Sequence, residues 1–194
     1  RISGSEPAFA QHITQLAQKL GLTASAFRNA SGWPDAAQVT SARDMAMLAI
    51  ALIRDFPQYY PAFSGHELTV GRRTFERTVK FLDLYPGADG LKTGYICASG
   101  FNLVASAVRD GRRLVGVAFG FRRADLRDEA MARLMDEAFA KKSGGGGQRV
   151  WQIANSGGVP TTVLGPGECG VLTYPYPGDA VWLGTYGNQA TALK

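Results

Sequence analysis

The segment from Asp89 to Tyr95, DGLKTGY, carries the side chains best suited to chemistry in this sequence. It places a cation, Lys92, beside the hydroxyl of Thr93 and the bare backbone of Gly94. A cation and a hydroxyl can hold a carboxylate and stabilise the negative charge that develops during acyl transfer. A glycine lets another chain lie close, because no Cβ intrudes. Taken alone the tripeptide is common, and a strand end with a turn glycine explains it at least as well.

The residues that follow predict the sheet that must position this segment. Two β-rich runs, 101–108 and 114–119, flank an Asp110-Gly111 pair. An Asp-Gly pair between two such runs is typical of a tight hairpin, so the two strands should be antiparallel neighbours. Apolar residues at helical spacing then predict a helix over 124–141. This order places Lys92-Thr93-Gly94 on a strand of an antiparallel sheet beside the closing helix.

Two more helices are predicted before this sheet. Residues 6–20 repeat apolar side chains at spacings of three and four, with Ser5 as a cap. The second helix starts at residue 40 or 41, where Ser41 and Asp44 have the spacing of a capping box. Residues 66–75 are predicted to form strands, with a turn near Arg72 and Arg73.

Composition indicates a folded domain and excludes several kinds of protein. Hydrophobic residues make up 45% of the 194 residues, and the net charge is +5. This charge favours an anionic partner without choosing among nucleic acid, wall polymer and lipid. Two histidines and two cysteines without C-x-x-C spacing give no metal site. Whether Cys97 pairs with Cys169 is open. The longest apolar run, 45–53, is too short to cross a bilayer.

The last quarter of the chain differs in composition. Residues 142–194 contain half of the glycines, and 142–148 reads as a Gly-rich linker. Short β-like runs follow, the first at 149–153. We therefore expect a first domain over 1–141 and a small β-rich piece over 149–194.

The chain resembles the serine D-alanyl-D-alanine carboxypeptidases of the penicillin-binding-protein type, relatives of the serine β-lactamases. Their signature combines S-x-x-K, a Ser-x-Asn element and K-T-G. The resemblance is collinear from about residue 2 to 140 and is carried by SARDMA at 41–46, DGLKTG at 89–94 and GFNLVASA at 100–107. It implies an α+β, transpeptidase-like domain, here partial, with an antiparallel sheet covered by helices.

The resemblance also implies roles for the K-T-G strand. Lys92 and Thr93 match residues that recognise the substrate carboxylate and supply electrostatic stabilisation, and Gly94 admits the substrate backbone along the strand. The backbone N–H of Tyr95 matches one of the two oxyanion donors. A side-chain role for Tyr95 does not carry over, because relatives often have a histidine or another polar residue there.

Two arginines are weaker matches. Arg77 corresponds to a basic or polar position near the pocket, and Arg127 to an arginine that helps orient the carboxylate-binding residues. A solvated surface charge is the alternative for each. Neither His12 nor His66 has a partner at a catalytic spacing, so we expect surface or structural roles for both.

The implied activity is removal of the terminal D-Ala from peptidoglycan stem peptides through an acyl-serine intermediate, with β-lactams acylating the same serine. No serine in the chain is followed three positions later by lysine, and Ser3-Gly4-Ser5 does not substitute for the Ser-x-Asn element. We expect both elements, and the partner helices, in a preceding half of the same protein. No cofactor and no nucleic acid are implied. The location should be periplasmic or otherwise extracytoplasmic, with any membrane attachment in a segment outside this chain.

Two alternatives stay open. The protein could be a non-catalytic peptidoglycan-binding homologue that keeps the pocket without the nucleophile. Separately, residues 180–190 loosely resemble the opening of SPOR-type peptidoglycan-binding domains, although the chain stops too soon to complete one.

Overall fold

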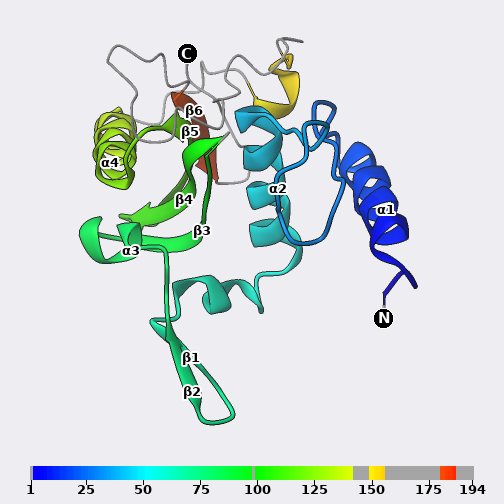
Figure 1. The fold of residues 1–194 in the computed structure, drawn as a ribbon. Helices are drawn as coiled ribbons and strands as arrows, with labels where there is room; N and C mark the ends of the chain where they lie inside the picture. Colours follow the sequence, from blue (N-terminus) through cyan, green and yellow to red (C-terminus); the bar gives the residue numbers. More distant parts are fainter. Residues whose placement is uncertain (1, 98, 142–148, 156–179, 187–194) are drawn as a thin grey trace.

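The computed structural model describes residues 2–97, 99–141, 149–155 and 180–186, and its main sheet has four antiparallel strands (Figure 1). In spatial order these are β3 (Ala88–Ile96), β4 (Gly100–Arg109), β5 (Arg112–Phe121) and β6 (Ala180–Tyr186). The predicted hairpin between β4 and β5 is confirmed. Its two turn residues, Asp110 and Gly111, have φ of 50° and 72°, the backbone that a two-residue hairpin turn requires. Strand β3 lies at one edge of this sheet, beside β4.

Two helices cover the two faces of this sheet. On one face, α2 (Ala42–Asp55) packs against Val115 and Val117 of β5. On the other, Met131 and Met135 of α4 (Ala124–Ala140) pack against β4 and β5. At Gly116 a Cβ would lie 2.5 Å from Met131 Sδ, so glycine lets α4 pack closely on β5. The predicted α+β architecture is confirmed.

The helices begin where the sequence predicts. The hydroxyls of Ser5 and Ser41 accept hydrogen bonds from the N–H groups three residues later and cap α1 (Glu6–Lys19) and α2. In a reciprocal capping box the Asp44 carboxylate would bond back to the cap. It is instead fully buried and accepts from Ala24 N at 2.8 Å and Ser25 Oγ at 2.7 Å. Burial opposes the charge of Asp44, but hydrogen bonds from Asn155, Ser25 and Ala24 hold the pKa of this carboxyl below its usual value.

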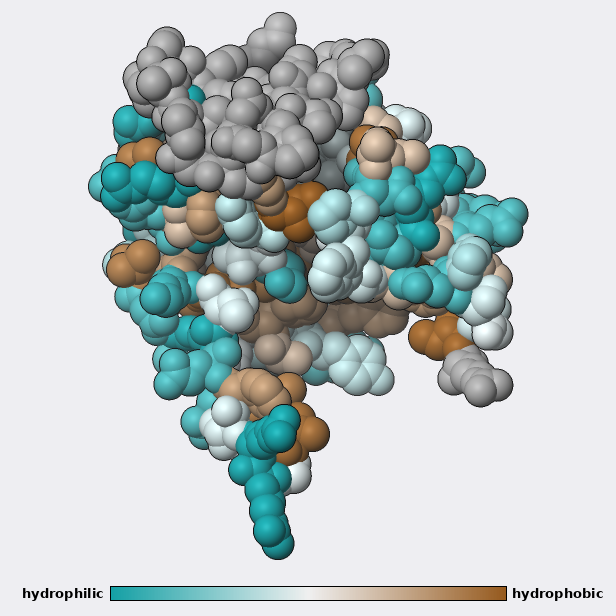
Figure 2. All heavy atoms as spheres, in the orientation of Figure 1, coloured by the Kyte–Doolittle hydropathy of each residue, from teal (hydrophilic) through white to brown (hydrophobic). Residues whose placement is uncertain are grey.

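A short 3-10 helix and a small hairpin connect α2 to the main sheet. The 3-10 helix η1 (Tyr60–Ser64) packs on β3, and the hairpin of β1 (Glu67–Val70) and β2 (Arg73–Glu76) projects from the body (Figure 1). The strands predicted over 66–75 are thus confirmed as a hairpin. Figure 2 shows apolar atoms beside its hydrophilic tip. Helix α3 (Phe81–Leu84) then leads into β3.

The described C-terminal segments pack on these same elements. The strand predicted over 149–153 is wrong, because η2 (Val150–Gln152) is a 3-10 helix. Val150 and Ile153 pack against Ala42 and Ala46 of α2, so a three-residue period buries both side chains. Strand β6 extends the main sheet beside β5. The Gly-rich linker and the remainder of 156–194 lie outside the described residues, and the domain boundary there stays a prediction.

Within the described ranges, no helix combines the length and apolarity needed to span a bilayer. The same part of the chain holds no cluster of His, Cys, Asp and Glu that could bind a metal ion. Cys97 is disulfide-bonded; Cys169, the other cysteine of the sequence, lies outside the described residues.

Candidate active site

The Lys-Thr-Gly tripeptide lies in the middle of the edge strand, as the sequence predicts. Lys92, Thr93 and Gly94 of β3 lie opposite Val104, Leu103 and Asn102 of β4, respectively. Among the described residues no strand pairs with the outer side of β3, so its backbone on that side can pair with an extended ligand.

The register of β3 against β4 fixes the face from which each side chain projects. Directly opposed residues of an antiparallel pair share a face. Val104, which lies opposite Lys92, packs into the clusters on the α2 side. Leu103 belongs to the core under α4, so Thr93 projects from the α4 side. The lysine and the threonine therefore border the open edge from opposite faces.

The turn that joins β3 to β4 shows which backbone groups point to the open edge. Ile96 donates its N–H to Ser99 Oγ at 3.4 Å, and its carbonyl accepts from Ser99 N at 3.1 Å. Both groups of Ile96 thus point toward β4. Backbone polar groups alternate in direction along an antiparallel strand, so those of Tyr95 and Thr93 point to the open edge. The Tyr95 N–H is therefore directed where a ligand can reach it.

The Lys92 ammonium lies at this same edge. Lys92 is exposed, and its Nζ donates to the carbonyl oxygen of Thr93 at 2.6 Å. Among the described residues Lys92 forms no ion pair, although several arginines of this domain do. Its charge is thus not neutralised within the described part of the chain. A cation beside an outward-pointing N–H is an arrangement suited to an anion or a developing oxyanion.

The ring of Tyr95 extends the edge strand beyond the glycine. It stacks on Phe101, directly opposite on β4, with ring centroids 4.2 Å apart. The ring is still 53% exposed. Gly94 lies between this ring and Thr93, and a Cβ at Gly94 would meet no atom within 4 Å. The space over the strand is therefore open at Gly94.

Arg127 lies behind the tripeptide, in the first turn of α4. Its guanidinium is buried and donates to the Asp128 carboxylate from Nε at 3.0 Å and from Nη2 at 2.7 Å. Its Nη1 reaches the carbonyl of Asn102, the residue opposite Gly94, at 3.3 Å. The surface-charge alternative is therefore wrong for Arg127, which links α4 to the strand next to the tripeptide.

Arg77 lies at the base of the projecting hairpin. It forms an ion pair with Asp83 of α3, and its Nη1 donates to the Ser64 carbonyl at 3.2 Å. Only 12% of its side chain is exposed. Arg77 therefore ties α3 to the end of η1, and within the described ranges it forms no ion pair or hydrogen bond with the tripeptide.

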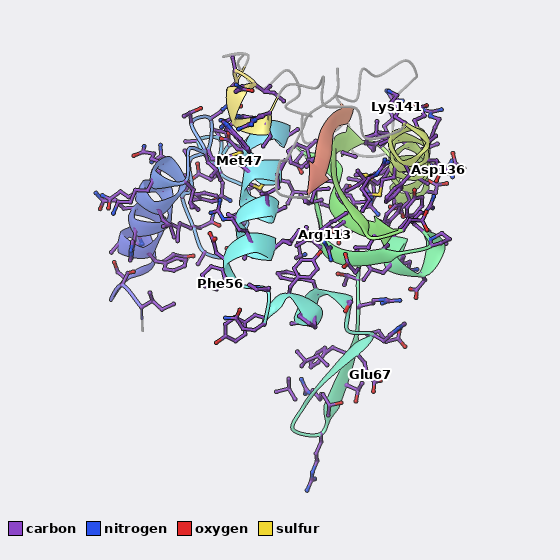
Figure 3. The ribbon with its side chains drawn as sticks, turned by 180° about the vertical axis from the view of Figure 1, so that it is seen from behind. Met47, Phe56, Glu67, Arg113, Asp136 and Lys141 are labelled. Atoms are coloured by element: carbon purple, nitrogen blue, oxygen red, sulfur yellow. The ribbon has the colours of Figure 1, made fainter. Side chains whose placement is uncertain are left out.

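The structure adds a polar cluster beside the tripeptide that the sequence did not predict. It consists of Tyr60, Asp89, Ser106 and Arg113, and we call it the strand cluster (Figure 3). Asp89 belongs to the DGLKTG segment that contains the Lys-Thr-Gly tripeptide, but the sequence assigned it no role. Its partners are 29 and 24 residues away along the chain, so spacing could not identify them.

Comparison with known proteins gives consistent matches over this region. Residues 1–122 match the family model described as D-alanyl-D-alanine carboxypeptidase. The curated D-alanyl-D-alanine carboxypeptidase DacC of Escherichia coli is 32% identical over 190 residues, which is 90% of this chain and 45% of that protein. The chain therefore spans less than half the length of this relative.

Solved structures show the same fold. Penicillin binding protein 5 from Haemophilus influenzae superposes with a TM-score of 0.68 at 33% identity, over 72% of this chain and 41% of that one. Penicillin-Binding Protein D2 from Listeria monocytogenes, solved in its cefotaxime-bound form, gives a TM-score of 0.63 at 27% identity, over 68% of this chain and 55% of that one. The expected transpeptidase-like architecture is thus confirmed for the matched part.

Proposed function

The chain belongs to the D-alanyl-D-alanine carboxypeptidase family, and we propose that its protein is a serine-type carboxypeptidase of the bacterial cell wall. The reaction is removal of the terminal D-Ala from peptidoglycan stem peptides. The observation that carries the proposal is the open edge of β3. There Lys92, which forms no ion pair within the described part of the chain, and the outward N–H of Tyr95 lie in one short strand segment.

The edge strand supplies substrate recognition in this proposal. A stem peptide ending in D-Ala is extended and carries a free carboxylate, so it can lie along the edge and pair with its backbone groups. Lys92 and the Thr93 hydroxyl attract the carboxylate from the two faces. Gly94 lets the peptide approach closely, since a Cβ there would occupy that space.

The chemistry requires a nucleophile that these residues serve. A serine oxygen attacks the carbonyl carbon of the D-Ala–D-Ala bond, and the carbonyl oxygen becomes negative. The Tyr95 N–H donates to this oxygen, and the Lys92 cation lowers the energy of the charge. The serine gives its proton to the activating lysine as it attacks, and the lysine passes that proton to the leaving nitrogen as the bond to this nitrogen breaks. Water later hydrolyses the ester, which frees the shortened peptide and returns a proton to the serine. We propose that the serine and its activating lysine come from outside residues 1–194, since the chain contains no S-x-x-K.

Arg127 and Arg77 act indirectly in this scheme, through the segments that they hold in place. The buried Arg127, whose charge is balanced by Asp128, holds β4 opposite Gly94 and thereby helps orient the residues that bind the carboxylate. Arg77 fixes the segment that leads from the hairpin to α3. Penicillin-Binding Protein D2 binds cefotaxime, and we propose that β-lactams acylate this protein at the same serine. Because the substrate lies outside the cytoplasmic membrane, we place the protein there.

A fluorescent penicillin tests the proposal directly. Protein expressed from its complete gene should be labelled covalently, and the label should survive denaturation and map to a serine followed three residues later by lysine. The purified protein should also release D-Ala from a pentapeptide. Binding to purified cell wall without labelling or D-Ala release would instead support the non-catalytic homologue.

A further inference from the structure

The strand cluster joins three strands and a connecting helix on the α2 side of the sheet. Arg113 reaches from β5, donating from Nη1 to Asp89 Oδ1 at 2.8 Å and from Nη2 to Asp89 Oδ2 at 2.7 Å. The same Nη1 donates to Ser106 Oγ of the intervening β4 at 2.5 Å. Tyr60 of η1 donates to Asp89 Oδ1 at 3.2 Å, and the guanidinium lies 5.0 Å from its ring centre.

Asp89 occupies a special place in β3. Ala88 pairs with Ala107 and Gly90 with Ser106, so one step on β4 corresponds to two steps on β3. Asp89 is thus the extra residue of a β-bulge. A bulge redirects a side chain and bends its strand, and its direction depends on what holds the extra residue. Here a two-pronged ion pair with Arg113 holds it, three residues before Lys92.

Tyr60 closes over the next residue of the strand. A Cβ on Gly90 would lie 2.4 Å from Tyr60 Oη and 3.2 Å from Cζ, so the phenol rests on the bare backbone of Gly90. The Leu91 side chain packs into the same apolar cluster as Tyr60. Residues 89–91 are therefore held by polar and apolar contacts, whereas Lys92 is exposed directly afterwards.

We propose that the strand cluster is a positioning device: by fixing the bulge at Asp89 it sets the path of the edge strand and thereby the placement of Lys92 and the Tyr95 N–H. The inference rests on the proposed acyl-transfer function of that edge. The four residues of the strand cluster act by holding β3 and do not touch the substrate in this scheme. A displacement of about 1 Å at reacting groups can slow a reaction about a hundredfold.

The arrangement also leaves Lys92 free for an anion. Asp89 is the acidic residue nearest to Lys92 in sequence, and Arg113 and Tyr60 engage its carboxylate oxygens. The pairing neutralises the Asp89 carboxylate. Removing Arg113 would expose an uncompensated carboxylate three residues from the cation that is meant to attract another carboxylate.

The chain offers a matched control for this cluster. Tyr85, Arg109 and Asp136, which we call the helix cluster, are the same three residue types on the α4 side, with a single rather than a forked bond between the arginine and the acid. Asp136 is labelled in Figure 3. Tyr85 Oη and Arg109 Nη1 each donate to Asp136 Oδ1 at 2.8 Å, and the guanidinium lies 4.4 Å from the Tyr85 ring centre. Asp136 lies on α4 rather than on the edge strand.

The test compares Asp89→Asn with Asp136→Asn in protein expressed from its complete gene. The first readout is the rate constant of covalent labelling by a fluorescent penicillin at saturation. The second is amide hydrogen exchange of residues 91–95, with thermal midpoints measured for every protein. We expect labelling to slow at least tenfold in Asp89→Asn and to change less than twofold in Asp136→Asn. Exchange at 91–95 should accelerate in Asp89→Asn alone.

A milder variant covers the case in which Asp89→Asn fails to fold. Tyr60→Phe removes one donor and keeps the ring over Gly90, and we expect labelling about threefold slower with a near-native midpoint. Tyr85→Phe is its control. Labelling of Asp89→Asn or, if that variant does not fold, Tyr60→Phe at the wild-type rate would overturn the inference. So would a loss that only follows the fraction of unfolded protein.

The exchange measurement separates this inference from the proposed function. If wild-type protein is not labelled by penicillin, the proposed function fails, and exchange alone decides the role of the cluster. Faster exchange confined to 91–95 in Asp89→Asn would still support positioning of the strand. Unchanged exchange there, or equal acceleration in Asp136→Asn, would overturn it.

Discussion

The strand cluster and the helix cluster use the same three side chains for different ends. In each, a tyrosine hydroxyl and an arginine donate to one carboxylate while the guanidinium stacks on the tyrosine ring. In the strand cluster the acid is 29% exposed and a buried serine is added. In the helix cluster the acid is 58% exposed and no strand of the sheet carries it.

This difference shows that the position of a polar cluster in the fold, more than its residue types, decides what the cluster can do. Exposed ion pairs contribute little to stability, because water and salt screen them. The helix cluster therefore mainly fastens α4 to the segment that leads into β3, where Arg109 also donates to the Pro86 carbonyl at 3.2 Å. The strand cluster, shielded by η1, holds a bulge three residues from Lys92 and so controls a geometry on which chemistry depends.

The largest effect should come from the residue that the strand cluster positions. Lys92→Ala should slow penicillin labelling about 100- to 1,000-fold, the loss typical of one electrostatic contact at a reacting centre. Stability should barely change, because Lys92 is exposed. Lys92→Arg should restore activity only in part, since a planar guanidinium is not a compact ammonium.

The same variant sharpens the comparison through a double-mutant cycle. Adding Asp89→Asn to Lys92→Ala should slow labelling by less than the same change does in the wild type, because one of the groups it positions is absent. Labelling kinetics of the four proteins give this coupling. Equal losses in both backgrounds would mean that Asp89 acts independently of the lysine.

Gly90→Ala should have the next largest effect and should act on stability. The new Cβ would lie 2.4 Å from Tyr60 Oη, so Tyr60 or the bulge must move, at about 1–3 kcal/mol of unfolding free energy. Denaturant unfolding measures this loss. Gly94→Ala is the control, since its Cβ meets nothing within 4 Å, and its unfolding free energy should stay at the wild-type value. Equal losses for both would show that Tyr60 does not constrain the bulge.

Local chemistry in the sequence was enough to predict much of the fold. Ser5 and Ser41 mark two helix starts, and Asp110-Gly111 marks a hairpin, because each acts on its own backbone. The run at 149–153 looked like a strand for the same local reason. It forms a 3-10 helix because packing against α2 favours a period that buries Val150 and Ile153 together.

The site residues separate in the same way, into those that local sequence identifies and those that depend on tertiary packing. The order of the predicted hairpin and helix placed Lys92, Thr93 and Gly94 on a strand, and the register confirms that they lie on one. Neither the burial of Arg127 nor the strand cluster could be predicted, because both depend on partners brought together by strand pairing. The Ser41–Asp44 spacing likewise predicted a cap but not that Asp44 would hold residues 24 and 25.

High pH should lower the unfolding free energy through both clusters, whereas only the strand cluster should influence labelling. Burial raises the pKa of Tyr60 to about 12, and burial with the Asp136 hydrogen bond raises the pKa of Tyr85. Above pH 10 the unfolded tyrosine loses a proton that the folded one keeps. Each cluster therefore loses stability as pH rises through that range, by up to about 1.4 kcal/mol per unit.

Both Tyr60→Phe and Tyr85→Phe should flatten this fall in unfolding free energy between pH 10 and 12, as measured by denaturant titration at several pH values. At pH 7, only Tyr60→Phe should slow labelling. A stability slope unchanged by either substitution would show that the phenol in question does not keep its proton in the folded protein.

The smallest effect should come from Arg109→Lys in the helix cluster. Lysine keeps the charge near Asp136 but loses the planar group that stacks 4.4 Å from the Tyr85 ring centre and 5.0 Å from that of Phe139. Such partly exposed contacts contribute about 1 kcal/mol or less each, so the unfolding free energy should fall by about 1 kcal/mol. Labelling should stay within twofold of wild type.

Arg113→Lys is the counterpart in the strand cluster. An ammonium cannot donate to both oxygens of Asp89 in the forked geometry while also reaching Ser106, so the bulge loses its fixed direction. The same chemical change should therefore slow labelling severalfold there, well beyond its effect in the helix cluster. If the two Arg→Lys variants lowered labelling equally, the two clusters would be functionally equivalent, and their different places in the fold would not matter for the reaction.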